Sequence, residues 1–342
     1  MSLAPSFWRA RFPNWPPLAA PLADGYTVLV PVPGDLPGLT RLALAVLGQQ
    51  QAAHRVATIV VPDQKSPAVE AIVASAQGSW SGALDVRELP LPERWFLVKL
   101  RSASRVHWLQ VVTGMGAVGS TYALLHDADL FLLDHAVLDT RFTLAQERGL
   151  ACLGVNQVWD EWYASKGRTM VATWEMLASV EWFRSFTPAE HGPHDGTIWG
   201  EHHTFDTTLH PQALTAPDRV AVEPIPAQSM VNFNYAIATY RMFQRAKTPF
   251  LDSGFRLLLL SVLTAVYGGQ CDVPPLEELS GYLGTSGRVL EFPTGEDGVA
   301  RYRDFRTSLG SVLRSELVPA DEARRAERLL APIDDHYSWS AG

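Results

Sequence analysis

The sequence is poor in cysteine and has no long apolar run. Cys152 and Cys271 are the only cysteines among 342 residues, and no CxxC spacing occurs. This pattern argues against a disulfide framework or a zinc–thiolate site and is typical of a reducing compartment. The most apolar stretch, residues 257–267, is interrupted by Ser261 and Thr264. It is far shorter than the roughly 20 residues that span a bilayer. The sequence therefore predicts a cytoplasmic protein without a membrane-spanning helix.

Runs of basic residues are also absent. The 28 Lys and Arg residues form no run longer than a pair, and the formal net charge is −8. A nucleic-acid partner bound through phosphate neutralisation is therefore not expected. Hydrophobic residues make up 47% of the chain and charged residues 19%, as in globular proteins with a sizeable core. The length suits one large α/β domain with an appendage, or two smaller domains.

Three common catalytic signatures are missing. There is no GxxxxGK[ST] phosphate loop, no GxGxxG directly following the first expected strand and no GxSxG nucleophile elbow. The sequence thus gives no indication of a P-loop site, a dinucleotide fingerprint or a hydrolase serine.

Strands and helices alternate regularly from Tyr26 onward, which predicts βαβ units and a mostly parallel sheet. Ser66 is expected to cap a helix. Residues 1–24, rich in proline and aromatics, are expected to form an extended arm on the surface. A catalytic domain is expected over 25–234 and a mostly helical region over 235–342. The expected strands are 26–30, 56–61, 84–89, 122–134 and a short one after Val220. The expected helices are 36–51, 66–76, 104–116, 172–186, 235–245, 252–267 and 321–330, and Asp321 is expected to cap the last of them. A polar loop is expected at 187–208 and turns at 281–298.

Two acids interrupt the apolar run at residues 122–134. In an extended chain, Asp127 and Asp129 point to the same side. Two like charges in an apolar strand are costly unless a cation or protons compensate. Mg²⁺ or Mn²⁺ fits such oxygen ligands and could bridge a nucleotide diphosphate. The alternative is that both acids cap the strand end through backbone hydrogen bonds.

The order of these features resembles the nucleotide-binding half of GT-A glycosyltransferases, in particular family 2-like enzymes. A strand ends in Pro31-Val-Pro33, a second ends in Pro62-Asp63, and His126-Asp-Ala-Asp129 follows a helix. The resemblance covers roughly residues 25–210. It implies a Rossmann-like, mostly parallel sheet flanked by helices, with a helical C-terminal region. It also implies a UDP- or GDP-sugar donor. The residues that it implies for nucleotide and phosphate binding are Pro31, Val32, Pro33, Asp63, Lys99, Arg101 and Asp127, with Asp127 and Asp129 on the metal.

A second cluster of titratable residues lies at 191–206, with four histidines, and His210 follows. The resemblance implies His202 or His203 as a third metal ligand, and one of Asp195, Glu201 and Asp206 as the base that deprotonates the acceptor. The adjacent Glu-Asp pair of the best-known inverting enzymes is absent, so the stereochemical outcome stays open. The plain alternative is a polar surface loop.

Three tryptophans, Trp159, Trp162 and Trp199, are expected either to stack on a sugar or to pack in the core.

Together these observations predict a metal-dependent glycosyltransferase that moves a sugar to the hydroxyl of a glycan, a lipid or a small molecule. A sugar-phosphate nucleotidyltransferase would carry a glycine-rich loop with an Arg after the first strand, and the loop at 31–38 contains no Arg. A phosphohydrolase would end that strand in an acid. A non-catalytic nucleotide-sugar-binding protein on the same fold remains open. The apolar C-terminal helices could pack on the sheet or form a dimer face, and a peripheral membrane contact is compatible with a lipid acceptor.

Overall fold

The computed structural model describes residues 4–93, 103–245, 253–267, 275–283 and 290–339. These residues form two compact units. The first contains the described residues up to Gly34, then Gln50–Ala128 and His135–Pro226. The second contains Asp35–Gln49, Asp129–Asp134 and the described residues from Ala227 onward. The units therefore divide the chain at other places than the predicted boundary after residue 234.

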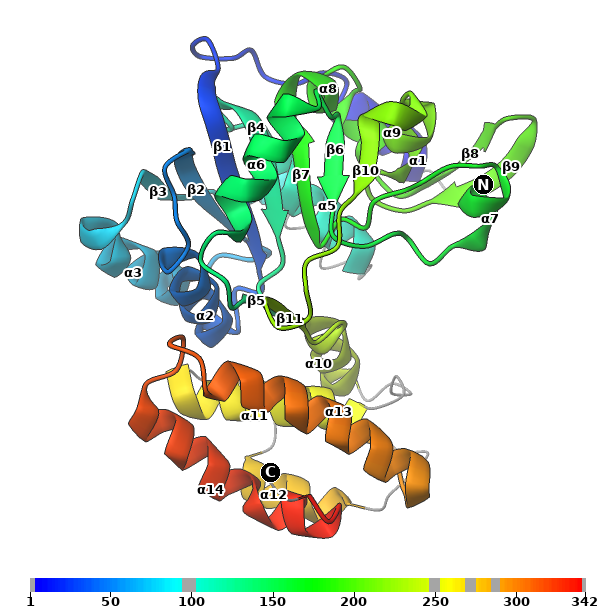
Figure 1. Ribbon diagram of the computed structural model, residues 1–342. Coiled ribbons are helices and arrows are strands. Elements are labelled where there is room, and N and C mark those ends of the chain that lie inside the picture. The colour runs from blue at the N-terminus through cyan, green and yellow to red at the C-terminus, as the bar shows by residue number, and fades with distance from the viewer. Residues whose placement is uncertain (1–3, 94–102, 246–252, 268–274, 284–289, 340–342) are drawn as a thin grey trace. The chain divides into compact units, whose positions relative to one another are not determined.

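A seven-stranded sheet forms the centre of the first unit, in the order β10-β6-β7-β4-β1-β2-β3 (Figure 1). Every neighbouring pair is parallel except the two that involve β7, which runs antiparallel to β4 and β6. The predicted mostly parallel sheet is confirmed. Its strands are β1 (Ala23–Val32), β2 (Arg55–Pro62), β3 (Ala83–Val86), β4 (Ser120–His126), β6 (Cys152–Gly154), β7 (Glu175–Ser179) and β10 (Val220–Val222).

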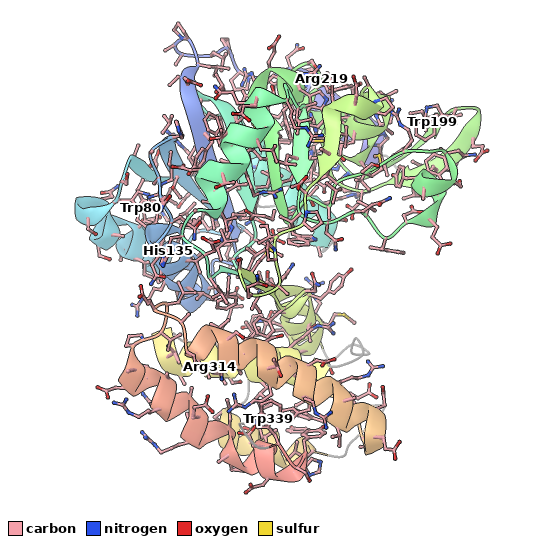
Figure 2. The ribbon with its side chains drawn as sticks, viewed as in Figure 1. Trp80, His135, Trp199, Arg219, Arg314 and Trp339 are labelled. Atoms are coloured by element: carbon pink, nitrogen blue, oxygen red, sulfur yellow. The ribbon has the colours of Figure 1, made fainter. Side chains whose placement is uncertain are left out.

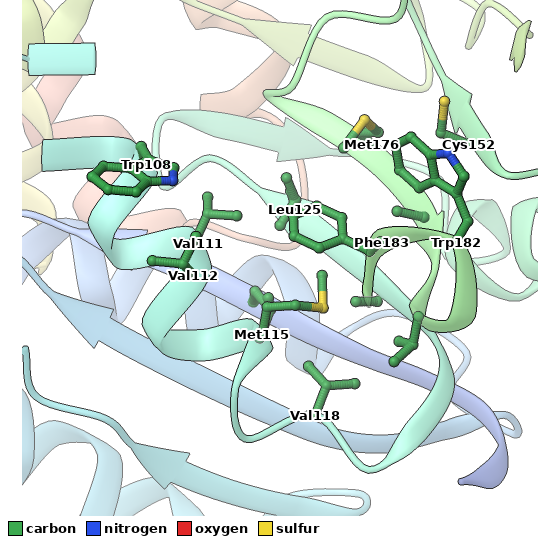
Figure 3. Close-up of a cluster of buried hydrophobic side chains, with 14 of the residues drawn as sticks. Trp108, Val111, Val112, Met115, Val118, Leu125, Cys152, Met176, Trp182 and Phe183 are labelled. Carbon is green, nitrogen blue, oxygen red and sulfur yellow. The ribbon is translucent and has the colours of Figure 1, made fainter. Parts of the chain in front are cut away.

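Helices cover both faces of this sheet, as side-chain alternation along β4 shows. Tyr122 contacts the ring of Phe142 on α6 (Val137–Glu147) on one face. On the other face, Leu125 packs in a buried cluster with Trp108 and Met115 of α5 (Ala103–Met115) (Figure 3). The remaining helices of the unit are α1 (Ala4–Arg11), α3 (Pro67–Ala76), α7 (Glu161–Ser165), α8 (Val180–Arg184) and α9 (Leu209–Leu214). Ser66 caps α3 as predicted, its side chain accepting from Val69 N.

The predicted extended surface arm is wrong over residues 4–11, which form α1. Trp8 is only 6% exposed, and its ring meets the edge of Trp108 with centroids 5.2 Å apart. Burying a large indole is strongly favourable, and it ties the N-terminal segment to α5.

Three other predicted elements differ from the structure. Residues 172–186 form β7 and α8 rather than one helix, because the apolar segment pairs between β4 and β6, and such tertiary pairing overrides helical spacing. Residues 187–208 form the 3₁₀ turn η2 (Pro188–His191) and the hairpin of β8 (His194–Ile198) and β9 (Glu201–Phe205), not a loop. The expected strand 122–134 ends at His126, and β5 (Leu130–Leu132) follows a turn.

The second unit is mainly helical. Two predicted helices are confirmed as α10 (Ala236–Gln244) and α11 (Ser253–Tyr267). Helix α13 begins at Gly295, inside the segment predicted as turns, and buried Arg306 joins it to Asp334 of α14 at 2.9 Å. Pro319, not Asp321, is the N-cap of α14.

Within the described residues, no helix has the length and apolarity to cross a bilayer. The unit comprises α2 (Pro37–Gly48), β5 paired antiparallel with β11 (Met230–Asn232), α10, α11, α12 (Leu276–Leu279), α13 (Gly295–Leu313) and α14 (Ala320–His336).

A buried histidine of the first unit makes its stability depend on pH. His191 is fully buried, stacks on Phe183 with ring centroids 3.7 Å apart, and has Nε2 2.8 Å from the Phe183 carbonyl oxygen. Burial lowers the pKa of His191 from 6.5 to about 3. Below pH 6.5, His191 therefore binds a proton in the unfolded chain but stays neutral in the folded chain until the pH nears 3. This contribution to stability is present above pH 6.5 and is lost as the pH falls toward 3.

We expect the free energy of unfolding to fall by about 1 kcal/mol per pH unit below pH 6 on account of this group. Urea unfolding at pH 7.5, 5.5 and 4.5 measures that slope. His191→Gln should flatten it, whereas His202→Gln, at an exposed position, should leave it unchanged. Equal slopes for the parent and His191→Gln would contradict the assignment.

Candidate active site at the carboxyl ends of the strands

The carboxyl ends of β1 and β2 are joined by Asp63. Its Oδ1 accepts a 2.8 Å hydrogen bond from Gly34 N, and its own N donates to Val32 O at 3.0 Å. Asp63 thus closes the loop after β1; Pro31 and Val32 are the last two residues of that strand, Pro33 begins the loop, and all three are buried. Ligands of open α/β sheets bind outside the carboxyl ends of the strands. The structure brings these four predicted residues together, and their contact with a nucleoside stays a prediction.

Gln110 of α5 fixes the same strand ends, and the sequence analysis did not identify it. Its side chain is 5% exposed. Nε2 donates to Val32 O at 3.0 Å and to Val61 O at 2.6 Å, across the ends of β1 and β2. A single glutamine in a helical pattern carries no signal of this role, because the role depends on how α5 packs on the sheet.

Asp127 directly follows β4, the other parallel neighbour of β1. Its N donates to Trp174 O at 3.0 Å, and its side chain is 32% exposed. Burial raises the pKa of Asp127 to about 7, and the Glu175 charge adds to the rise while His126 opposes it. The carboxylate therefore lies where its negative charge is poorly compensated by the protein alone.

A buried acid–histidine pair lies beside Asp127. His126 and Glu175 are cross-strand partners of β4 and β7 and are both fully buried. Nδ1 of His126 lies 2.8 Å from Oε2 of Glu175. Among the residues that the structure describes, the second ring nitrogen of His126 and Oε1 of Glu175 have no hydrogen-bond partner. Glu175 was missed because the sequence predicted a helix at its position.

His107 of α5 connects Asp127 electrostatically to Asp206. Its Nε2 lies 3.7 Å from Asp127 Oδ1. Burial lowers the pKa of His107, and the charge of Asp206 acts in the opposite direction. Asp206 is exposed and follows β9, and its Oδ1 accepts from Thr207 N at 2.7 Å. Of the three acids predicted as the base, Asp206 is the one with electrostatic ties to this neighbourhood.

The other predicted residues of the second cluster make different contacts. Oδ1 of Asp195 accepts a 2.7 Å hydrogen bond from Thr204, across the hairpin. Glu201 accepts from Lys166 Nζ at 2.5 Å and from Trp162 Nε1 at 3.0 Å.

The two histidines predicted as metal ligands lie next to each other on β9. Successive residues of a strand point to opposite faces, so His202 and His203 do not converge. His202 is exposed, and His203 Nε2 lies 3.0 Å from Asp160 Oδ2. In the part of the chain that is described, no three His, Cys, Asp or Glu side chains are placed to hold a metal ion together. The structure therefore does not assemble the predicted set of two aspartates and a histidine.

The second acid of the pair, Asp129, belongs to the second unit, because the boundary between the units falls after Ala128. It is 6% exposed and lies in a turn just before β5. The expectation that both acids share one extended strand is thus wrong, since pairing with β11 directs β5 into a different sheet. Their joint binding of one ion stays a prediction. Lys99 and Arg101 lie outside the described residues.

The residues around Asp127 fit a divalent cation only when a phosphate ligand completes the coordination of that cation. Asp127 offers one partly exposed carboxylate, and Nε2 of His107 is buried and has no hydrogen-bond partner within the described part of the chain. Mg²⁺ commonly takes one or two protein carboxylates, with water and substrate phosphates completing its shell. The residues therefore fit a cation shared with a phosphate ligand, and they do not fit a site made of protein ligands alone.

No protein-family model matches the chain, and no curated protein matches it. Solved structures that resemble it include TarS residues 1–349 from S. aureus, at TM-score 0.40 and 13% identity over 92% of this chain and 89% of that one. The same fragment in complex with UDP gives 0.37 and 12%, with the same coverage. A galactosyltransferase, LgtC, with donor and acceptor sugar analogs gives 0.38 and 9%, over 48% of this chain and 62% of that one. Core-mannan synthase A from Aspergillus fumigatus, in a Mn/GDP form, gives 0.34 and 8%, over 47% and 61%. Solved glycosyltransferases are thus among the structures that this chain resembles. At TM-scores of 0.40 and below, this resemblance carries no conclusion about function.

Proposed function

We propose that this chain is a glycosyltransferase that uses a nucleoside-diphosphate sugar together with Mn²⁺ or Mg²⁺. The observation that carries the proposal is the position of Asp127. It follows β4 at the carboxyl edge of the sheet, beside the ends of β1 and β2 that Asp63 and Gln110 hold together. This edge is where open parallel sheets bind nucleotides.

In this proposal the loop of Pro31, Val32 and Pro33 contacts the nucleoside, with Asp63 fixing its shape. Asp127 holds the cation together with Asp129, which is assigned from the sequence alone. When bound, the cation supplies positive charge that stabilises the diphosphate as the leaving group. His107 keeps a ring nitrogen 3.7 Å from Asp127 Oδ1, beyond hydrogen-bond distance.

Asp206 is proposed as the base. Its carboxylate accepts the proton of the acceptor hydroxyl while the acceptor oxygen bonds to the anomeric carbon. The bond from that carbon to the diphosphate breaks, and its electron pair leaves with the diphosphate. A base in this role is what an inverting displacement requires. Asp206 is exposed, so an acceptor can reach it. The dimer face and the membrane contact weighed from the sequence gain no support from the described residues.

The proposal is tested by thermal unfolding with UDP or GDP, with and without Mn²⁺. We expect stabilisation that needs both nucleotide and metal. It should reach about 2.7 kcal/mol when the nucleotide is present at a hundred times its dissociation constant. Asp127→Asn should abolish the metal-dependent part, whereas Asp195→Asn, on the hairpin, should keep it.

Stabilisation that persists in Asp127→Asn, or that no nucleoside diphosphate produces with Mn²⁺, would contradict the proposal. A hydrolysis assay with UDP- and GDP-sugars separates an enzyme from a binding protein on the same fold. The enzyme releases sugar slowly to water, and the binding protein releases none.

A further inference from the structure

A stacked layer of aromatic rings lies on the β8–β9 hairpin and α7. We call Trp159, Trp162, Trp199 and His203 the aromatic platform. Trp162 lies flat on His203, with planes 6° apart and centroids 3.8 Å apart, and it stacks on Trp199 at 25° and 5.4 Å. Trp199 is 43% exposed at the end of the hairpin (Figure 2), and Trp159, three residues before Trp162, is 85% exposed. Large rings exposed to this degree call for an explanation.

Polar contacts hold the edges of these rings in place. Nε1 of Trp162 donates to Glu201 at 3.0 Å, and Asp160 lies 3.0 Å from His203. Asp160 also caps α7 by accepting from Trp162 N at 3.0 Å. The Arg168 guanidinium lies 5.4 Å from the Trp199 ring and donates to the carbonyl oxygens of Ala213 and Thr215. Trp162, Trp199 and His203 are thus fixed before any ligand arrives, so binding to them would lose little side-chain entropy.

The backbone at the hairpin turn is strained. Trp199 has φ 54° and is followed by Gly200 with φ 81°. Two residues with positive φ suit this kind of turn, and Asn-Gly is the favoured pair. A bulky residue in this region is an outlier that costs about 1 kcal/mol or more. Tryptophan at this position does not help the turn, which indicates that its exposed ring serves another purpose.

We infer that the aromatic platform binds the sugar rings of an oligosaccharide acceptor, beyond the unit that is modified. The inference rests on the proposed function and names its acceptor class. A pyranose ring presents a face of C–H groups that packs on an indole, while its hydroxyl groups reach the rim. The rim here contains Asp160 and Glu201, whose carboxylates accept hydrogen bonds from hydroxyls. Carboxylates at the rim also disfavour an anionic lipid surface.

The position of the platform along β9 sets a length requirement. Asp206, the proposed base, directly follows β9, and His203 and Trp199 precede it by three and seven residues. At about 3.4 Å per strand residue, these residues lie up to roughly 10 Å and 24 Å along the chain from Asp206. An oligosaccharide extended along the hairpin is long enough to reach from Asp206 to the outer rings.

Direct binding tests this inference without donor or cation. The probes are malto-, cello- and chito-oligosaccharides of two and six units, titrated by tryptophan fluorescence and calorimetry. We expect at least one series to bind, with the six-unit member tighter. Trp159→Ala and Trp199→Asn should each weaken it about ten-fold or more, the effect of losing one aromatic contact. Trp199→Asn suits the positive φ and so should not lower the thermal unfolding midpoint. Leu18→Ala, at another exposed apolar residue, should change nothing.

The two proposals fail separately. Asp127→Asn should keep oligosaccharide binding and lose metal-dependent nucleotide binding. The inference is overturned if no series binds at millimolar concentration, or if both tryptophan variants bind like the parent. Trp159-dependent sedimentation with phosphatidylglycerol vesicles would assign the platform to a lipid surface instead. Self-association that disappears in Trp159→Ala would assign it to a second copy of the chain.

Discussion

Asp127→Asn will lower the rate of sugar transfer about 10²–10³-fold and leave the fold intact. Removing one charged group that stabilises a developing negative charge in an enclosed site has an effect of this size. The amide keeps the shape of the side chain but loses the charge that a cation needs. Because burial raises the pKa of Asp127 to about 7, the charge is unfavourable for folding, and the variant should unfold at the same temperature or higher.

The measurement is the steady-state rate of UDP- or GDP-sugar hydrolysis, or of transfer once an acceptor is known. Asp195→Asn removes an acid from the hairpin surface, where the side chain bonds only to Thr204 among the described residues, and it should stay within a few-fold of the parent. A rate for Asp127→Asn within ten-fold of the parent would exclude the assigned role.

Glu175→Leu will destabilise the protein by about 1–3 kcal/mol, the usual effect of leaving a buried polar group without its hydrogen-bond partner. The variant leaves Nδ1 of His126 without its acceptor in a fully buried place. It also removes a charge that favours the protonated form of Arg141, whose pKa burial lowers.

Urea unfolding of Glu175→Leu, His126→Leu and the double variant forms a complete cycle. The double variant should be more stable than either single variant, since two apolar side chains leave no unpaired group. Additive losses, or a change below 1 kcal/mol in Glu175→Leu, would show that the pair is not coupled.

Local signals in the sequence were enough for the parallel half of the sheet. β2 ends at Pro62, and Ser66 with Pro67 begins a helix, so these boundaries depend on nearby residues, whereas β1 continues through Pro31 to Val32, beyond its predicted end at Val30. The segment 172–186 depends on distant ones. Its apolar residues suit a helix equally well until β4 and β6 supply hydrogen-bonding partners on both sides.

The candidate site, like the fold, was predictable where it depends on residues that are close in the sequence. Asp63 and Asp127 follow β2 and β4, whose apolar residues the sequence places in strands, so both were singled out, and their roles stay predictions. His107 and Gln110 act through the packing of α5 against the strand ends, which no local pattern encodes. The resemblance to GT-A glycosyltransferases implied His202 or His203 as a metal ligand. The structure instead stacks His203 on Trp162, an arrangement that depends on how the hairpin folds back on α7.

The path of the chain between the two compact units has a consequence for producing fragments. Helix α2 lies between β1 and β2 in the sequence, yet it packs on α11, and β5 pairs with β11. The units are therefore interleaved rather than joined by one linker. A truncation near residue 234 would remove α11, on which α2 packs, although Leu39, Leu42 and Val46 of α2 are all buried in the full chain. Expression of the sheet alone should yield aggregates, and minimal soluble versions must retain the C-terminal helices.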